Sequence, residues 1–442
     1  MNKKIRIGCG AGFSGDRIEP AIVLAEKGAL DYLVLECLAE RTIGLAQKRK
    51  MLDPSKGYDP LLEKRIATLL PHLIKNSTRL ITNMGAANSL AGAKKIIEIA
   101  LQQNIKIKVA AITGDDILSI IHQNASTITD LENDKPLSDY NIISANAYIG
   151  ADIIVEALKT NAQIIITGRV ADPSLFLAPM IYEFGWDTNN YDLMGKGTVI
   201  GHLLECAGQV TGGYFADGVH KKVDGLDKLG HPFADVLADG SGTISKVEGT
   251  GGVVNLQTAK EQLLYEVMNP HEYFTPDVIA DFTTVHLKET EKDKVYVSGG
   301  SGKTKPATYK ASIGYKAFYL GEGEISYAGA AAYERAQLAG DIIRQRLQHT
   351  FSDIRIDLIG IQSMHKTTFG HETAPYEVRL RVAAKAGSAA DAALVGEEVE
   401  ALYTNGPAGG GGARKYVNEV IGIVSTLIDR NTITPQVNIF ES

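Results

Sequence analysis

The chain has 442 residues, of which 44% are hydrophobic, and it carries a formal net charge of −7 at pH 7. This length predicts about two or three domains with a large buried core, and the acidic balance disfavours a general nucleic-acid-binding protein. The three cysteines form no Cys-x-x-Cys pair, which indicates a reducing cytoplasm, and the lack of any run of about 18 apolar residues argues against a membrane-spanning helix.

The N-terminal half of the chain alternates apolar strand patterns with helix patterns. The strand patterns lie at residues 5–9, 31–36, 79–83, 106–112 and 163–166. Alternation of this kind predicts a parallel sheet with helices on both faces. We therefore expect an α/β fold whose N-terminal domain, residues 1–218, is built on a parallel sheet.

The second half of the chain has a different pattern. A loop rich in glycine and aspartate runs from Tyr214 to Asp239, and several antiparallel strand patterns lie between residues 278 and 323. Long helix patterns follow at residues 325–347 and 417–428. We expect residues 219–442 to form a C-terminal α+β domain with antiparallel strands.

The first predicted strand ends in glycines at positions 10, 12 and 15, which match the pattern G-x-G-x-x-G. That pattern brings a dinucleotide pyrophosphate to a helix N-terminus, so an NAD(P)-dependent oxidoreductase is one alternative. The next residues are Asp16 and Arg17, and the acid would repel a phosphate. A tight turn and an anion-binding nest for another ligand are the other interpretations.

Polar residues follow four of the predicted strands, at the edge where ligands bind to parallel sheets. We expect these side chains to line one cleft as catalytic or substrate-binding groups: Asp16, Arg17, Asn83, Asn88, Asp115, Arg169 and Asp172. Helix capping is the alternative for Asn88, Asp115 and Asp172 taken singly.

The stretch Gly168-Arg169-Val170-Ala171-Asp172-Pro173 follows the strand at residues 163–166. Its arginine can hold an anionic group and place Asp172 beside it. Asp172 or Asp115 is the expected catalytic proton carrier, because burial raises the pKa of a carboxyl group towards neutrality.

His202 and Cys206 lie four residues apart in a predicted helix, 199–207. This spacing allows a metal-ligand pair or a thiol nucleophile with a histidine base. A small buried apolar cysteine is the favoured interpretation, and we expect no metal and no cofactor.

Four consecutive glycines, Gly409, Gly410, Gly411 and Gly412, precede Arg414 near the C-terminus. Backbone amides in such a loop can point at one anion. We predict a substrate-binding loop here, with a flexible linker as the alternative.

The run from Thr167 to Gly218, the opening Gly8–Arg17 and this glycine-rich segment together resemble the acyclic terpene utilisation AtuA family, over nearly the whole chain. The resemblance implies a role in bacterial degradation of citronellol and geraniol through CoA thioesters. Some members of that family carry an extra C-terminal module, which this chain is expected to lack.

Residues and resemblance together predict a cytoplasmic enzyme that acts on a small anionic substrate, either a carboxylate or an acyl-CoA thioester. The expected chemistry is acid/base catalysis of the lyase, hydratase or isomerase type. A non-catalytic subunit that depends on a small partner chain is the alternative. We expect a homo-oligomer that binds neither nucleic acid nor membranes.

Overall fold

The computed structural model describes residues 3–366 and 375–442. The chain forms two compact units: unit 1 consists of Met1–Gly314 and Ile423–Ser442, and unit 2 of Tyr315–Gly422. The domain boundary expected between residues 218 and 219 lies inside unit 1, because the strands that follow it join the same sheet as the first strand.

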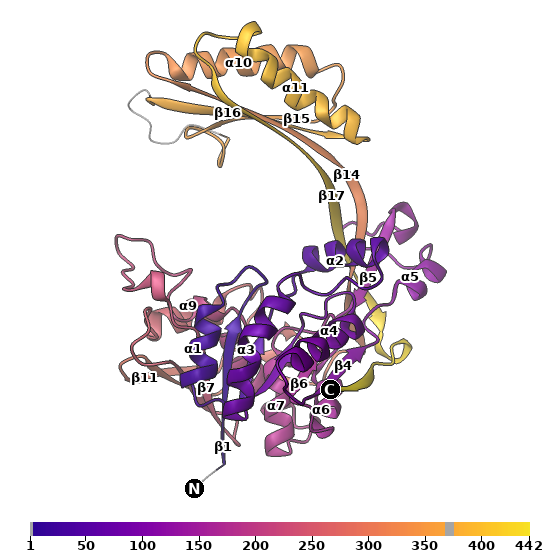
Figure 1. The fold of residues 1–442 in the computed structure, drawn as a ribbon, viewed down its shortest axis with the longest axis vertical. Coiled ribbons are helices and arrows are strands. Elements are labelled where there is room, and N and C mark those ends of the chain that lie inside the picture. Colours follow the sequence, from indigo (N-terminus) through magenta and orange to yellow (C-terminus); the bar gives the residue numbers. More distant parts are fainter. Residues whose placement is uncertain (1–2, 367–374) are drawn as a thin grey trace. The chain divides into compact units, whose positions relative to one another are not determined.

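The centre of the unit 1 sheet consists of five parallel strands, close to where the sequence predicts them (Figure 1). In spatial order these are β1 (Lys4–Ala11), β2 (Tyr32–Leu35), β3 (Arg79–Thr82), β6 (Ile164–Ile166) and β4 (Lys108–Thr113). All four neighbouring pairs are parallel, so their carboxyl ends lie at one edge of the sheet.

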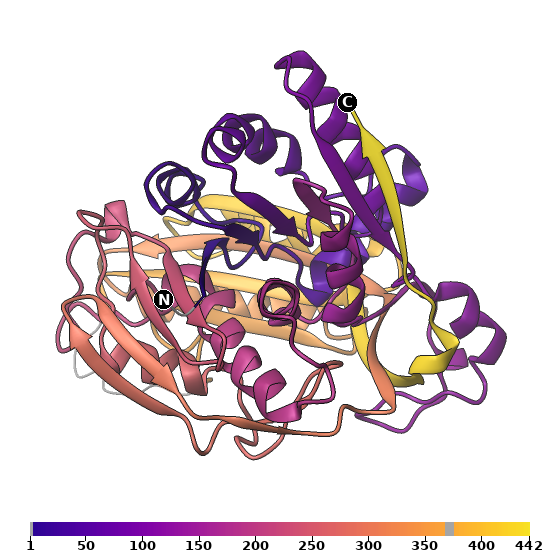
Figure 2. The ribbon, with the colours of Figure 1, turned by 90° about the horizontal axis from the view of Figure 1, so that it is seen from below.

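Antiparallel strands extend this parallel centre on both sides to ten strands. Beside β1 come β7 (Pro232–Leu237), β8 (Gly242–Lys246), β12 (Lys294–Ser298) and β11 (His286–Glu291). Beside β4 lies β18 (Gln436–Glu441), drawn yellow in Figure 2 next to the purple β4. The sheet is therefore mixed, with the predicted parallel strands at its centre. The loop expected over Tyr214–Asp239 contains β7, which pairs with the distant β1.

Helices cover both faces of the parallel strands, as predicted. One face packs against α1 (Glu19–Lys27), α3 (Leu62–Asn76) and α4 (Ser89–Gln102), and the other against α6 (Ala151–Lys159), α7 (Ser174–Phe184) and α8 (Tyr191–Glu205). Leu33 and Leu35 of β2 belong to the core beneath the first three helices. Successive strand residues face opposite ways, so the buried Tyr32 and Val34 face the second set.

Unit 1 also contains α2 (Glu40–Leu52), α5 (Leu118–Asn124) and α9 (Leu256–Leu264). Its further strands are β5 (Ile142–Ala147), which pairs with β14 (Thr308–Ala328), and a small sheet of β9 (Tyr273–Phe274), β10 (Ile279–Asp281) and β13 (Ser301–Lys303).

Unit 2 is an α+β unit, in which two helices cover one face of an antiparallel sheet (Figure 1). The sheet order is β15 (Ile354–Ile359), β16 (Glu377–Ala386), β14 and β17 (Gly411–Asp429), and the helices are α10 (Ala332–Leu347) and α11 (Ala389–Asn405). One core of side chains from both layers holds the unit together.

Two helices expected from the sequence are wholly or partly strands. The helix expected at residues 417–428 is part of β17, where Val424, Thr426 and Ile428 are buried in alternation. The helix expected at residues 325–347 begins only at Ala332, because Ile325 and Tyr327 still alternate inward along β14. A short apolar run does not distinguish the two periods, and pairing within the sheet decides the outcome.

Within residues 3–366 and 375–442, none of the helices has the length and apolar character that crossing a bilayer requires. Cys9, Cys37 and Cys206 are all free thiols.

Unit 2 is one continuous segment whose two ends lie side by side. A Cβ atom added to Gly422 of β17 would lie 2.3 Å from the ring of Tyr315 in β14. We predict that replacing residues 315–422 with a two-residue Asn-Gly turn leaves unit 1 folded, since such a turn joins adjacent antiparallel strands. Circular dichroism and thermal melting measure the outcome, and the isolated segment 315–422 is expected to melt cooperatively as well. Loss of the melting transition in the shortened chain would contradict this division of the protein.

Candidate functional site

Two cavities lie in unit 1 at the carboxyl ends of the parallel strands. The first has a volume of about 960 Å³ and the second about 610 Å³. Both are lined by Leu38, Ala39, Asp172 and Glu266, so they meet at these residues. The loops after β1, β2 and β6 contribute to their walls, which is the position where open parallel sheets bind ligands.

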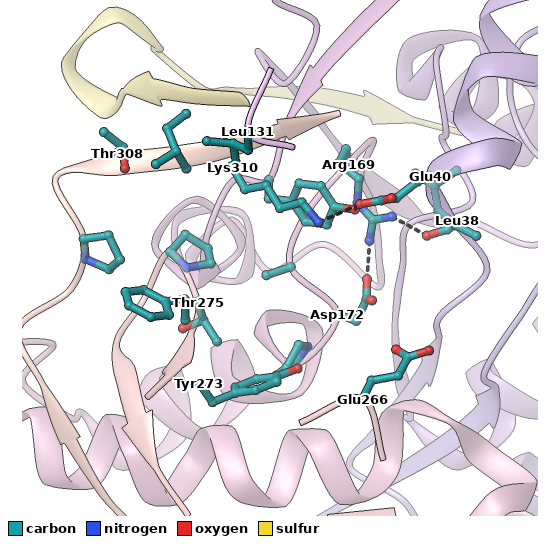
Figure 3. A pocket seen from close by; sticks show the side chains of 18 of the residues that line it. Leu38, Glu40, Leu131, Arg169, Asp172, Glu266, Tyr273, Thr275, Thr308 and Lys310 are labelled. Atoms are coloured by element: carbon teal, nitrogen blue, oxygen red, sulfur yellow. Dashed lines mark hydrogen bonds and ion pairs between the residues drawn. The ribbon is translucent and has the colours of Figure 1, made fainter. Parts of the chain in front are cut away.

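Arg169 lies at the floor of the first cavity, and only 1% of the residue is exposed. Its guanidinium donates to the carbonyl oxygens of Leu38 and Val170 and to the carboxylate of Asp172 (Figure 3). The Tyr148 ring lies 4.4 Å from its Cζ atom. These four hydrogen bonds use most of the five guanidinium N–H groups within the protein.

Asp172 lies at the junction of the two cavities. About 40% of its side chain is exposed, while Arg169 fixes one of its carboxylate oxygens. Burial raises the pKa of the Asp172 carboxyl above its usual value, and the charge of Arg169 opposes this shift. A carboxylate with one oxygen fixed and its surface facing two cavities is placed to take up and release a proton.

Asp115 supports the turn that carries Arg169 and lines neither of these cavities. Its Oδ2 atom accepts hydrogen bonds from the Arg169 backbone N–H at 2.8 Å and from Asn146 Nδ2 at 3.0 Å. A side chain at position 168 would clash with it, since a Cβ on Gly168 would lie 2.5 Å from Oδ2. Burial raises the pKa of Asp115 to about 6. Its position is that of a group that orients the turn.

One side of the first cavity is apolar and the other is charged. The apolar wall includes Leu131, Phe274, Pro276, Pro306 and Leu427. On the opposite side Glu40 accepts hydrogen bonds from Tyr148 Oη at 2.7 Å and Lys310 Nζ at 2.8 Å (Figure 3).

Tyr273 lines the first cavity near Asp172 and Glu266 (Figure 3). Burial, together with the charges of nearby carboxylates, raises the pKa of its hydroxyl strongly. The hydroxyl therefore keeps its proton and is a hydrogen-bond donor at neutral pH.

The second cavity is lined by buried acids and their supports. Asn83 donates to Glu36 Oε1 at 2.8 Å and accepts from the Cys37 N–H at 2.7 Å. These two hydrogen bonds hold the loop that follows β2. Burial raises the pKa of Glu36 well above its usual value, and the charge of Asp172 adds to this shift.

Asp16 also lines the second cavity, but its carboxylate accepts the backbone N–H groups of Gly12 at 2.6 Å and Phe13 at 3.3 Å. A Cβ on Gly12 would lie 2.5 Å from the backbone of Cys206, so close packing explains this glycine. The backbone N–H groups of this glycine turn therefore bind the carboxylate of Asp16.

Arg17 is exposed and donates to the carbonyl oxygens of Leu226 and Asp227, and it lines neither cavity. Asn88 is the N-cap of α4, where its side chain accepts the Ala91 N–H at 3.2 Å. The structure therefore does not bring these two residues to the cavities with Asp172.

The glycine segment near the C-terminus belongs to unit 2. Arg335 donates to the carbonyl oxygen of Ala408 at 2.7 Å, and Gly411 and Gly412 already lie in β17. Gly409 and Gly410 thus enter a strand and not a helix, and Arg414 is an exposed strand residue. The helix expected to follow these glycines at residues 417–428 is replaced by β17, and anion binding by the glycine amides stays a prediction.

His202 faces Glu205 and not Cys206: its Nδ1 atom lies 2.8 Å from Glu205 Oε1. Burial lowers the pKa of His202 to about 4, and burial together with the charge of Glu205 raises the pKa of the Cys206 thiol. A protonated thiol is a poor nucleophile. Among the described residues, no group of three or more potential ligands is arranged to hold a metal ion.

Several residues of the site escaped the sequence analysis. Glu36 and Glu40 follow β2 and obey the same strand-end rule as Asp172, so that rule was sufficient to find them. Tyr273, Glu266 and Lys310 come from the antiparallel part of unit 1, whose position relative to the strand ends is set by tertiary packing alone.

Residues 5–439 match the family model described as acyclic terpene utilisation family protein AtuA. The chain belongs to this family. Membership confirms the resemblance seen in the sequence and implies a role in acyclic terpene utilisation. No curated protein and no solved structure matches this AtuA family chain.

The raised pKa of Asp115 has a measurable consequence for stability. A carboxyl whose pKa is higher in the folded than in the unfolded protein stabilises the fold below about pH 4, and this contribution is lost as the pH rises through about 6. Asp115→Asn cannot ionise at this position. We predict that its unfolding free energy, relative to that of the wild type, is about 3 kcal/mol higher at pH 7 than at pH 4. Urea unfolding at both pH values measures this difference, and a difference that stays constant with pH would contradict the prediction.

Proposed function

We propose that this AtuA family chain is an enzyme that transfers a proton on an acyclic terpenoid or branched carboxylate, or on its CoA thioester. The position of Asp172 is the observation that carries the proposal. Two carboxylates, Asp172 and Glu266, line both cavities, and Asp172 is the one that Arg169 fixes there.

The environment of Asp172 suits a proton carrier. Burial raises its pKa above the usual value, and the charge of Arg169 opposes this shift by favouring the ionised form. A carboxyl group held between such opposing effects is suited to act as a base and then as an acid. Asp115 acts through Arg169, because it holds the backbone N–H of that residue.

The first cavity favours a substrate with an apolar chain and an anionic end. Leu131, Phe274 and Leu427 offer an apolar surface for a branched hydrocarbon. Lys310 and Arg41 line the same cavity and provide positive charge for a carboxylate or for the phosphates of a CoA group.

Proton removal from the carbon next to a carbonyl places negative charge on the carbonyl oxygen. In the proposed step Asp172 accepts that proton, while the protonated hydroxyl of Tyr273 donates a hydrogen bond to the oxygen. Return of the proton at another carbon gives an isomerase, and loss of a leaving group from the neighbouring carbon gives a lyase or, in reverse, a hydratase.

The substitution Asp172→Asn tests this role, because it removes the proton acceptor and keeps the shape of the side chain. We expect a loss of about 10²- to 10⁴-fold in kcat. The assay incubates acyclic terpenoid acids and their CoA thioesters with the protein in D₂O and follows deuterium uptake and product formation by mass spectrometry.

The control for this experiment is Asp116→Asn, which changes an exposed carboxylate that is paired with Lys50 and lines neither cavity. Its deuterium uptake should equal that of the wild type. Equal uptake in the wild type and in Asp172→Asn would show that another group carries the proton.

A further inference from the structure

The charged side chains that line the second cavity are acidic, and the proposed proton transfer does not explain this. Five carboxyl groups line it: those of Asp16, Glu36, Asp172, Glu205 and Glu266. No lysine or arginine is among its lining residues, and Arg169 lies beneath the surface with 1% exposure. An anionic ligand would be repelled there, whereas a cation would be attracted.

Glu205 provides a second and independent observation. Its Oε1 atom lies 2.8 Å from His202 Nδ1, but its Oε2 atom is buried and has no hydrogen-bond partner among the described residues. Only 10% of this side chain is exposed. A buried polar atom without a partner is uncommon in proteins, so Glu205, which lines this cavity, keeps one unused acceptor.

The carboxyl group of Glu205 is close enough to those of Asp172 and Glu266 for their charges to act on it. Burial raises the pKa of Glu205 well above its usual value, and these two charges add to the shift. A cation in the cavity would favour the ionised form of Glu205.

Aromatic side chains complete the wall of the second cavity. Tyr214 and Tyr265 line it with ring centroids 6.1 Å apart in an edge-on arrangement, and Phe13 lines it as well. Aromatic faces attract alkylammonium groups. A bare metal ion fits less well, since no group of three or more ligands among the described residues is arranged to hold one.

From this combination we propose that the second cavity binds an organic ammonium group, whose N–H donates to Glu205 Oε2. This ligand is distinct from the anionic substrate of the first cavity. The two cavities meet at Asp172, so the ammonium-bearing molecule lies next to the proton carrier.

Calorimetric titration with three probes of equal length tests the charge preference: n-butylammonium, n-butanol and butyrate. For the full-length wild type at pH 7 we expect n-butylammonium to bind at least tenfold tighter than n-butanol, and butyrate not to bind.

The substitution Glu205→Gln should weaken n-butylammonium binding at least tenfold. The matched control is Glu261→Gln, which removes an exposed carboxylate of α9 that pairs with Lys221 and does not line the second cavity. Its affinity should equal that of the wild type. If Glu205→Gln does not fold, Glu266→Gln replaces it and should weaken binding in the same direction.

Three results would overturn the proposal. One is butyrate binding as tightly as n-butylammonium, and another is the absence of ammonium binding to the wild type at millimolar probe concentrations. The third is displacement of the ammonium probe by equimolar K⁺ or Mg²⁺, which would make the cavity a metal site. Each readout is independent of turnover, so the outcome does not depend on the function proposed for the first cavity.

Discussion

The structure of the candidate site depends on one buried cation, the guanidinium of Arg169. A charge removed from water is tolerated only when hydrogen bonds and an opposite charge compensate its lost hydration. Arg169 meets this requirement with the carbonyl oxygens of Leu38 and Val170 and with the carboxylate of Asp172. These contacts join the loop after β2 to the loop after β6, so the same bonds that neutralise the charge also form the floor of the first cavity.

This constraint explains why Asp172 has a defined position even though about 40% of its side chain is exposed. Its backbone belongs to a turn in which Asp115 accepts the N–H of Arg169. The guanidinium of Arg169 donates to its carboxylate. The first cavity then meets the acidic second cavity at Asp172, together with Leu38, Ala39 and Glu266. A reacting group placed between two cavities of different charge can receive chemically different molecules from the two sides.

The sequence predicted the parallel centre of unit 1 and the strand-end positions of Asp16, Asn83, Arg169 and Asp172, because apolar strands followed by polar turns carry a local signal. It did not predict the direction of each side chain. Arg17 points away from the cavities and Asn88 caps a helix, and both outcomes depend on neighbours from distant parts of the chain.

The elements that the sequence analysis missed were those decided by pairing at long range. β17 has an apolar pattern that also fits a helix, and β18 pairs with β4 although the whole of unit 2 separates them in the sequence. Lys310 and Tyr273 enter the first cavity from such elements, so no local pattern was able to assign them to the site. The family model matches residues 5–439 as one continuous region, and the contacts of these two residues come from the structure alone.

The glycine turn after β1 shows how a local pattern takes its meaning from tertiary structure. In a dinucleotide site the amides of G-x-G-x-x-G face a pyrophosphate. Here the amides of Gly12 and Phe13 face the carboxylate of Asp16, which occupies the place of such an anion. A nucleotide would have to displace Asp16 and bring its own charge into a cavity that no lysine or arginine lines. The electrostatics therefore favour the first cavity, with Lys310 and Arg41, for an anionic group, and this preference is the physical reason to separate the roles of the two cavities.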